Sequence, residues 1–294
     1  MSELPFGEEF RKKLEMLRII TARASGSARE GLRRGTKKGG PIEFHDHREY
    51  SPGEDLRRID WNVYGRTEKL FVKEFAKEEE GNVCVLVDLS ASMAYGAPGK
   101  ALYAKRVAAA LAYVALAAGD TLSVAAYAED LGAGLPERIG QGEIYSVIDF
   151  LEKLVPGGKT SLGGAMRRFL STTRRRGALM VISDVWESEE FLREIRPIKA
   201  RGFDIVLIHV LSPQEENPPA EGNLRLRDSE TPGEEMDLFV GRREIDRYRR
   251  ELAARHDLLR GFCHNHGINY IFTTTDVPFE ELILGPLRRS GVLA

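Results

Sequence analysis

Three polar residues at alternate positions directly follow an apolar run. Asp88, Ser90 and Ser92 come after the five apolar residues 83–87. A continuous apolar run of this length predicts a strand buried on both faces, as in a parallel sheet. The polar residues would then emerge at the carboxyl edge of the sheet, where open α/β sheets bind ligands. One carboxylate and two neutral hydroxyls suit a hard divalent cation such as Mg²⁺ or Mn²⁺, whereas zinc prefers imidazole and thiolate.

Two more oxygen donors occupy positions predicted to share this edge. A hard cation needs more oxygen ligands than one loop supplies. Thr160 stands just before a predicted helix, and Asp184 ends the apolar strand predicted at 178–183. If this strand lies beside the strand 83–88 at the centre of the sheet, Asp88 and Asp184 flank the same crevice.

Strands and helices alternate along the chain from residue 83 onward, which predicts a mostly parallel, Rossmann-like α/β sheet with helices on both faces. The predicted strands are 83–88, 121–128, 131–139, 178–183, 203–210 and 268–272, and the predicted helices are 100–118, 142–154, 161–176, 187–201, 242–265 and 279–289. A hairpin insertion is expected at about 212–240, after a loop at 212–222. We expect this domain to cover 81–294 and a separate N-terminal segment, with a helix at 8–24, to cover 1–80.

The five oxygen donors occur in the order of a known site. Asp88, Ser90, Ser92, Thr160 and Asp184 together resemble the metal-ion-dependent adhesion site of von Willebrand factor A domains. The resemblance implies a von Willebrand A-like fold in which the three hydroxyls bind the ion and the two carboxylates act largely through bound water. Such an ion stays electrophilic and can accept an acidic side chain from a partner protein. The resemblance therefore implies docking rather than catalysis.

A second resemblance rests on a segment before this domain. Its residues are Glu43-Phe44, Arg48-Glu49-Tyr50-Ser51-Pro52-Gly53-Glu54-Asp55, Arg57, Ile59-Asp60-Trp61 and Gly65-Arg66. This signature resembles the domain-of-unknown-function-58 family, in which it precedes a von Willebrand A-like domain; Glu54 and Gly65 depart from the usual Asp and Ala. Members are typically encoded beside MoxR-type AAA+ ATPases and are thought to act as their adaptors or co-chaperones, which makes such an ATPase the expected partner.

Two hypotheses account for the signature segment. Its arginines and carboxylates can form an ion-pair network that clamps the segment onto the following domain. Alternatively, Arg48, Arg57, Asp60, Trp61 and Arg66 can form a partner-binding surface, since arginine and aromatic residues are enriched at the centres of interfaces. The two hypotheses are compatible.

The composition of the 294 residues is that of an ordinary globular protein, with 42% hydrophobic residues and a net charge of −2. This charge provides no overall attraction to nucleic acid or to membranes. The longest apolar stretch, 107–118, is shorter than the roughly 20 residues of a membrane span. We therefore expect no membrane span, no nucleic-acid partner and a cytoplasmic location. The basic segment 23–38 is interpreted as a solvated linker or as a contact for an acidic patch.

The expected function is a non-enzymatic, metal-dependent interaction module. It would act as an adaptor of a MoxR-type ATPase toward an unidentified client protein, with Mg²⁺ (or Mn²⁺) binding an acidic residue of a partner. The alternative is a metal-dependent hydrolase, a phosphatase or peptidase, in which Ser90 or Ser92 is the nucleophile. A nucleophile also needs a base that orients it, and no histidine lies near these serines in the sequence.

Overall fold

The computed structural model describes residues 6–20, 44–50, 59–67, 69–75, 81–128, 131–186, 188–218, 222–227 and 235–294. The chain divides into two compact units, one formed by 1–27 with 81–294 and the other by 28–80. The first residues therefore belong with the α/β unit, whereas the sequence placed them in a separate segment 1–80. The basic segment 23–38 lies outside the described residues.

The larger unit is built on a six-stranded sheet, with the order β10-β7-β6-β3-β4-β5. Its strands are β3 (Asn82–Asp88), β4 (Thr121–Tyr127), β5 (Leu131–Arg138), β6 (Ala178–Ser183), β7 (Asp204–Leu211) and β10 (Asn269–Thr274). Every neighbouring pair is parallel except β4 with β5. This arrangement confirms the predicted mostly parallel α/β sheet. The direction of winding reverses between β3 and β6, which is the place where such sheets bind ligands.

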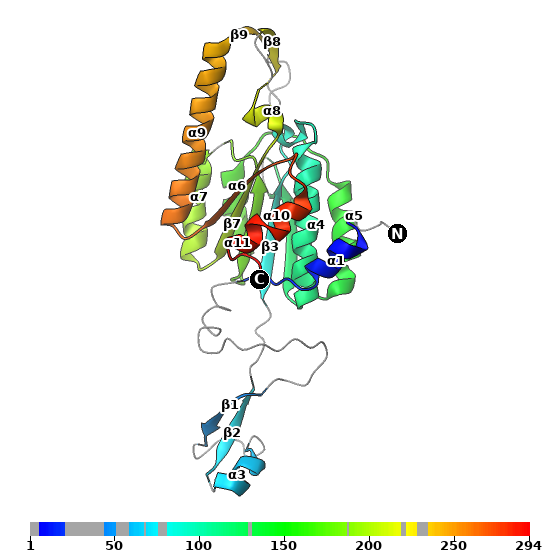
Figure 1. Cartoon of the computed structure of the whole chain (residues 1–294), viewed down its shortest axis with the longest axis vertical. Helices are drawn as coiled ribbons and strands as arrows, with labels where there is room; N and C mark the ends of the chain where they lie inside the picture. The colour runs from blue at the N-terminus through cyan, green and yellow to red at the C-terminus, as the bar shows by residue number, and fades with distance from the viewer. Residues whose placement is uncertain are drawn as a thin grey trace. The chain divides into compact units, whose positions relative to one another are not determined.

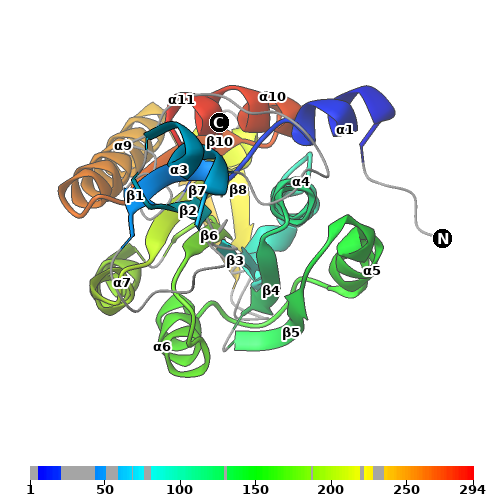
Figure 2. The same cartoon turned by 90° about the horizontal axis from the view of Figure 1, so that it is seen from below.

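Helices cover both faces of the sheet (Figure 2). One face carries α1 (Glu8–Leu14), α4 (Lys100–Ala118), α5 (Ile144–Lys153), α10 (Phe279–Leu284) and α11 (Pro286–Arg289). The other carries α6 (Leu162–Thr172), α7 (Ser188–Ala200) and α9 (Arg242–Asn265). The strands β3 and β6 are buried along their whole length, because both faces of the central sheet are covered.

Helix α4 has the length and apolar composition of a membrane span, whereas the sequence showed only a shorter apolar stretch. A search of the described residues finds this one such helix, and 72% of its apolar window is buried within the structure. It packs against β3, α5 and α10. This burial is that of a core helix, since neighbouring elements cover most of its surface.

The N-terminal helix is shorter than the sequence predicted. It ends at Leu14, although a helix was expected over 8–24. Leu17 and Ile19 are buried all the same, because the following chain is extended and Ile19 pairs with Leu293 near the C-terminus. The apolar spacing suited a helix, and pairing with a distant segment made the backbone extended instead.

Two further elements differ from the prediction. The loop expected at 212–222 begins with a short helix, α8 (Pro213–Glu216). The helix expected at 279–289 is two helices, α10 and α11, separated by Gly285 with φ −105° and ψ −90°. Pro286 explains this break, because a proline disfavours the helical conformation of the residue before it.

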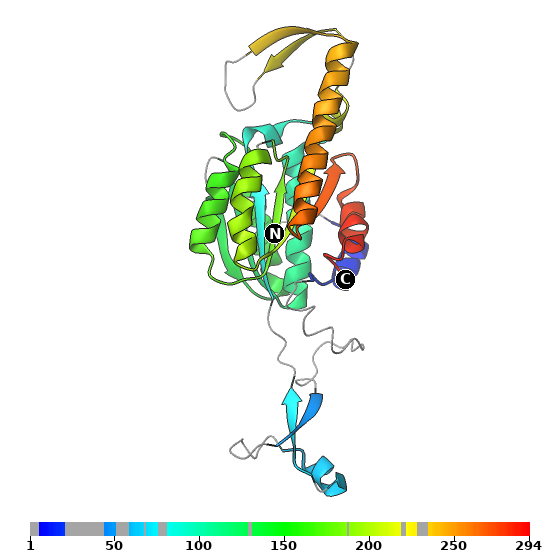
Figure 3. The same cartoon turned by 90° about the vertical axis from the view of Figure 1, so that its left-hand side faces the viewer.

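An antiparallel hairpin lies within the range 212–240. Its strands are β8 (Gly222–Arg227) and β9 (Glu235–Val240), paired so that Leu224 faces Leu238. The hairpin and the first turns of α9 extend past the end of the sheet at which the parallel strands finish (Figure 3). Met236 and Phe239 of β9 are exposed.

Among its described residues, the smaller unit has an antiparallel ribbon of two strands and the helix α3 (Figure 1). Strand β1 (Phe44–Glu49) pairs with β2 (Phe71–Phe75), and α3 covers Trp61–Thr67. Asp60 begins the helix, since its Oδ1 accepts hydrogen bonds from the backbone N–H groups of Asn62 at 2.9 Å and Val63 at 3.4 Å. This is the bonding pattern of an N-cap residue.

Candidate site at the carboxyl edge of the sheet

Asp88 ends β3 and is completely buried. Its Oδ1 accepts hydrogen bonds from the Ser90 N–H at 2.9 Å and the Ser90 Oγ at 2.7 Å. Its Oδ2 accepts from the Ser183 Oγ at 2.6 Å and the Tyr127 hydroxyl at 3.1 Å. Ser183 and Tyr127 end the neighbouring strands β6 and β4. Asp88 is thus held by the loop that follows its own strand and by groups from the ends of the two adjacent strands.

Hydrogen bonds connect Asp88 to Asp184 through the two serines. The Ser90 and Ser92 hydroxyl oxygens are 3.0 Å apart, and the Ser92 Oγ donates to the Asp184 Oδ2 at 2.8 Å. Ser92 is 92 residues from Asp184 in the chain. The structure therefore brings together four of the five residues predicted from the sequence.

Thr160, the fifth predicted residue, is buried on the loop before α6. Backbone hydrogen bonds attach this loop to the loop after β3: the Gly157 N–H donates to the Leu89 carbonyl at 2.8 Å, and the Ala91 N–H donates to the Gly158 carbonyl at 3.0 Å. The segment that carries Thr160 therefore borders the segment that carries Ser90.

Lys100 also lies at this edge of the sheet, although the sequence did not predict it as a site residue. Its side chain is completely buried, and its Nζ donates to the Asp184 Oδ2 at 2.8 Å and to the Glu215 Oε1 at 2.5 Å. Lys100 is the first residue of α4, and Glu215 lies in α8. A lysine at the first position of a helix whose later turns are apolar is the signal that could have indicated a buried ion pair, since lysine is almost never fully buried unless paired.

Burial sets the protonation of two groups near the edge. Burial and the neighbouring Asp184 carboxylate raise the pKa of Asp88 to about 6, although hydrogen bonds from Ser183 and Ser90 favour the charged form. Burial lowers the pKa of His209 on β7 to about 3, and its Nδ1 lies 2.8 Å from the Tyr270 hydroxyl. His209 is therefore neutral near pH 7, while Asp88 titrates just below that pH.

The backbone is strained directly after Asp184. Val185 has φ 47°, a left-handed conformation that is an outlier for a β-branched residue. Its N–H donates to the Ser183 Oγ at 2.9 Å, so the same serine contacts both Asp88 and the strained residue. Strain of this kind costs on the order of 1–3 kcal/mol and clusters at functional sites.

The donor set of this edge consists of hydroxyl and carboxylate oxygens. Over the described ranges, no group of three or more His, Cys, Asp or Glu side chains is placed to hold a metal ion. A cation here would therefore need the hydroxyls of Ser90 and Ser92, which suits a hard ion and not zinc. The Asp184 Oδ1 is buried and has no hydrogen-bond partner among the described residues, so the residues present fit a hard cation as an additional partner.

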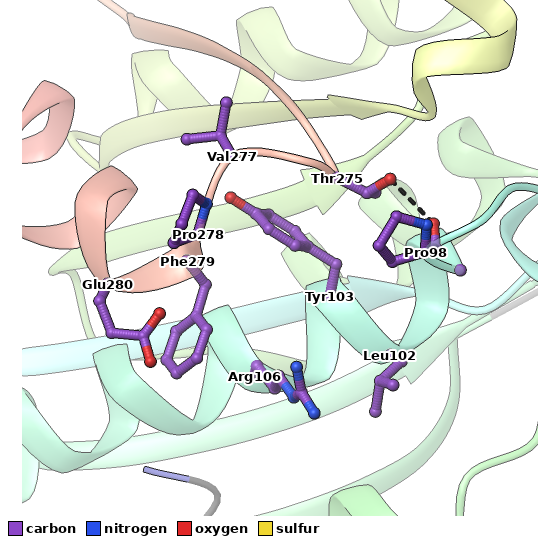
Figure 4. A pocket seen from close by; sticks show the side chains of 10 residues that line it. Pro98, Leu102, Tyr103, Arg106, Thr275, Val277, Pro278, Phe279 and Glu280 are labelled. Atoms are coloured by element: carbon purple, nitrogen blue, oxygen red, sulfur yellow. Dashed lines mark hydrogen bonds between the residues drawn. The ribbon is translucent and has the colours of Figure 1, made fainter. Parts of the chain in front are cut away.

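A pocket of about 220 Å³ lies beside the edge, between the start of α4 and the β10–α10 connection (Figure 4). Tyr103, Phe279 and the oppositely charged Arg106 and Glu280 line it. The Thr275 Oγ1 donates to the Pro98 carbonyl at 2.8 Å across one end. Because the lining carries both a positive and a negative side chain, it does not indicate a particular class of ligand. The pocket lies next to the carboxyl edge and is not part of it.

The candidate partner-binding residues belong to the smaller unit. Asp60 is buried as the cap of α3, whereas Trp61 is 60% exposed and Arg66, in the last turn of α3, is also exposed. Arg48 is in β1, and Arg57 lies outside the described residues. The structure thus describes two exposed aromatic residues, Trp61 and Tyr64, and the exposed Arg66 on the same short helix.

The fold and this edge define a mostly parallel α/β protein. Its buried polar cluster lies between β3 and β6, at the switch point where the direction of winding reverses. A family model described as "Protein of unknown function DUF58" matches residues 46–258, and the chain belongs to this family, as the signature segment predicted. A curated relative is the uncharacterized protein Rv1480 of Mycobacterium tuberculosis (strain H37Rv), 29% identical over 191 residues. The match covers 63% of this chain and 60% of that protein, so the chain spans less than two thirds of this relative's length.

Similar solved structures share low sequence identity with the chain. The conserved hypothetical protein BatB from Bacteroides thetaiotaomicron is 17% identical with a TM-score of 0.45, covering 72% of this chain and 98% of that one. An aerotolerance-related membrane protein from Bacteroides fragilis is 18% identical with a TM-score of 0.45, covering 71% and 99%. An uncharacterized membrane spanning protein from Vibrio fischeri is 16% identical with a TM-score of 0.26, covering 72% and 98%.

These comparisons correct one expectation. Two of the three structures are described as membrane proteins, which contradicts the cytoplasmic location expected from the sequence. That expectation rested on the net charge and on the apolar stretches of this chain, and it is withdrawn.

Proposed function

We propose that the carboxyl edge is a metal-ion-dependent adhesion site in a von Willebrand A-like fold. In this proposal, Asp88, Ser90, Ser92, Thr160 and Asp184 supply the oxygen atoms for Mg²⁺ (or Mn²⁺). The observation that carries the proposal is the series of hydrogen bonds from Asp88 through both serines to Asp184, whose Oδ1 has no partner in the described part of the chain. The position of this series of hydrogen bonds at the switch point between β3 and β6 supports it.

Each side chain has a distinct part in this proposal. The hydroxyl oxygens of Ser90 and Ser92 would be neutral ligands of the cation. Their hydrogen bonds to the two carboxylates already hold them in position. Ser183 and Tyr127 fix the Asp88 carboxylate from the neighbouring strands, as outer groups commonly do at metal sites. When bound, the cation would supply an electrophilic centre that accepts an acidic side chain of a partner.

The proposed role is a non-enzymatic adaptor or co-chaperone of a MoxR-type AAA+ ATPase toward an unidentified client. Membership of the DUF58 family supports this partner, given the association of such proteins with these ATPases stated above. Trp61 and Arg66 in the smaller unit offer a second contact surface, because exposed aromatic and arginine residues commonly anchor interfaces.

A retention experiment tests the proposal. The full chain is immobilised and a MoxR-type ATPase from the same genome is passed over it, in Mg²⁺ or in EDTA. The variants are Ser92→Ala, which removes one hydroxyl donor, and Asp184→Asn. Asp149→Asn is the control, since this exposed carboxylate on α5 only pairs with Lys153. We expect retention by the wild type and the control in Mg²⁺, and loss with EDTA or with either site variant.

Retention that is unaffected by EDTA and by both site variants would overturn the metal-dependent capture. The hydrolase alternative has its own readout in the same preparations. Turnover of a generic phosphatase or peptidase substrate that disappears in Asp88→Asn, without loss of folding, would favour that alternative.

A further inference from the structure

A cation of the chain itself already contacts the proposed metal site. The Lys100 ammonium is completely buried and lies 2.8 Å from the Asp184 Oδ2. The same oxygen accepts the hydrogen bond of the Ser92 hydroxyl. Lys100 therefore neutralises a carboxylate that a divalent cation would also use.

Lys100 has a second carboxylate outside the set of proposed metal ligands. Its Nζ also contacts the Glu215 Oε1. Glu215 is fixed in place, since its Oε2 accepts hydrogen bonds from the Ser212 N–H at 2.7 Å and the Ser212 Oγ at 2.9 Å. A small movement of the ammonium away from Asp184 would therefore leave it paired with Glu215.

Glu215 is also connected to the long helix α9. Its carbonyl oxygen accepts a hydrogen bond from the Tyr248 hydroxyl at 2.6 Å. Helix α9 follows β9, whose residues are mostly exposed, directly in the chain. The position of Lys100 between its two carboxylates is thus next to a contact between α8 and α9.

Two cations bound to one carboxylate repel each other, and the repulsion is strong where water is excluded. We propose that Lys100 is a tethered cation that competes with the divalent cation for Asp184, and that Glu215 retains Lys100 when the divalent cation binds. This inference rests on the proposed function, because it concerns the same site. It assigns to Lys100 and Glu215 the tuning of metal affinity, and it makes occupancy of the site sensitive to the position of α8.

Mn²⁺ binding tests this inference. It is measured by titration calorimetry and by the loss of the electron paramagnetic resonance signal of free Mn²⁺. In Lys100→Met the competitor is removed without much change in side-chain length, so we expect affinity to rise about tenfold or more. In Glu215→Gln the ammonium loses its second anion and stays on Asp184, so we expect affinity to fall several-fold. Lys105→Met is the control, since Lys105 lies on the same helix and bonds the Leu154 carbonyl instead.

The double variant separates competition from a general charge effect. If Glu215 acts through Lys100, adding Glu215→Gln to Lys100→Met leaves the affinity of Lys100→Met unchanged. If the double variant binds Mn²⁺ several-fold more weakly than Lys100→Met, Glu215 acts directly and its assigned role is wrong. Melting curves with and without Mn²⁺ check that each variant is folded. Lys100→Gln, which keeps a hydrogen-bond donor, replaces Lys100→Met if the latter does not fold.

The outcomes distinguish this inference from the proposed function. If the wild type binds Mn²⁺ and the folded Lys100 variant binds it equally or more weakly, competition by Lys100 is overturned and the metal site remains. If neither the wild type nor any folded variant binds Mn²⁺, the proposed metal site fails and this inference fails with it. Binding by the Lys100 variant but not by the wild type would support the inference in its strongest form.

Discussion

Two polar regions of the molecule are built in opposite ways. At the carboxyl edge of the sheet, Asp88 and Asp184 are buried, and several of their partners come from distant parts of the chain, as in the Asp88–Ser183 bond across 95 residues. In the smaller unit, the Asp60 carboxylate caps the helix that follows it, through backbone N–H groups two and three residues along the chain, and Trp61 beside it is 60% exposed.

This difference separates structural from interaction roles. A buried polar network is expensive to break, because every group left behind loses its partner without gaining water. An exposed residue with local contacts contributes little to the free energy of unfolding, so its chemistry is available for a partner. Variants that remove one residue at a time should therefore give large stability changes at the edge and small ones in the smaller unit.

The largest expected effect is that of Asp88→Ala. The change leaves the hydroxyls of Ser90, Ser183 and Tyr127 without their common acceptor in a buried position. We expect a loss of about 3–5 kcal/mol in the free energy of unfolding, because each buried hydroxyl left without an acceptor costs about 1–3 kcal/mol. Urea denaturation followed by circular dichroism measures it.

Asp149→Ala serves as the matched control, since the Asp149–Lys153 pair on α5 is exposed and such pairs contribute little. Equal losses for Asp88→Ala and Asp149→Ala would mean that the network at the edge contributes nothing special to stability, and the comparison between the two regions would be wrong.

The second prediction concerns pH, and two buried groups contribute with opposite signs. The folded-state pKa of Asp88 is raised from 3.8 to about 6, so its contribution favours folding at low pH and is lost as the pH rises through about 6. The folded-state pKa of His209 is lowered from 6.5 to about 3, so its contribution is present above pH 6.5 and is lost as the pH falls.

The contributions of Asp88 and His209 can be separated by measuring the free energy of unfolding in EDTA between pH 4 and 7. The proteins compared are the wild type, Asp88→Asn and His209→Gln. Relative to the wild type, Asp88→Asn should gain on the order of 2–3 kcal/mol as the pH rises across this range, because the buried ionised carboxylate is absent. His209→Gln should instead lose less stability than the wild type on acidification. Parallel curves for all three proteins would contradict both pKa shifts.

The sequence predicted the convergence at the edge because strand ends in a parallel sheet have few possible positions. An apolar run followed by Asp88 and another followed by Asp184 are sufficient for that inference once the strands are neighbours. Lys100 escaped prediction because the direction of a side chain in the first turn of a helix depends on how the helix crosses the sheet. The end of α1 escaped it for a similar reason, since the pairing of Ile19 with Leu293 depends on a segment at the other end of the chain.

The third prediction is a moderate loss from Asp60→Ala. The substitution removes the acceptor for the Asn62 and Val63 N–H groups at the start of α3, and loss of such a cap costs about 1 kcal/mol. Amide hydrogen exchange of residues 61–67 measures the local loss without requiring the two units to unfold together. Asp60→Asn is the control, since asparagine caps a helix about as well, and an equal loss in both variants would show that the cap is not the cause.

The smallest stability change is expected for Trp61→Ala. The indole is 60% exposed and contacts the Tyr64 ring edge-to-face at a centroid distance of 6.0 Å, so we expect a change below about 1 kcal/mol. If the exposed ring serves an interface, the same variant should weaken retention of the MoxR-type ATPase at least about tenfold, as removal of an aromatic anchor commonly does. Tyr145→Ala is the control, because Tyr145 on α5 is also an exposed aromatic. A large loss of stability with unchanged retention would reverse the roles of the two regions, since it would make Trp61 a structural residue.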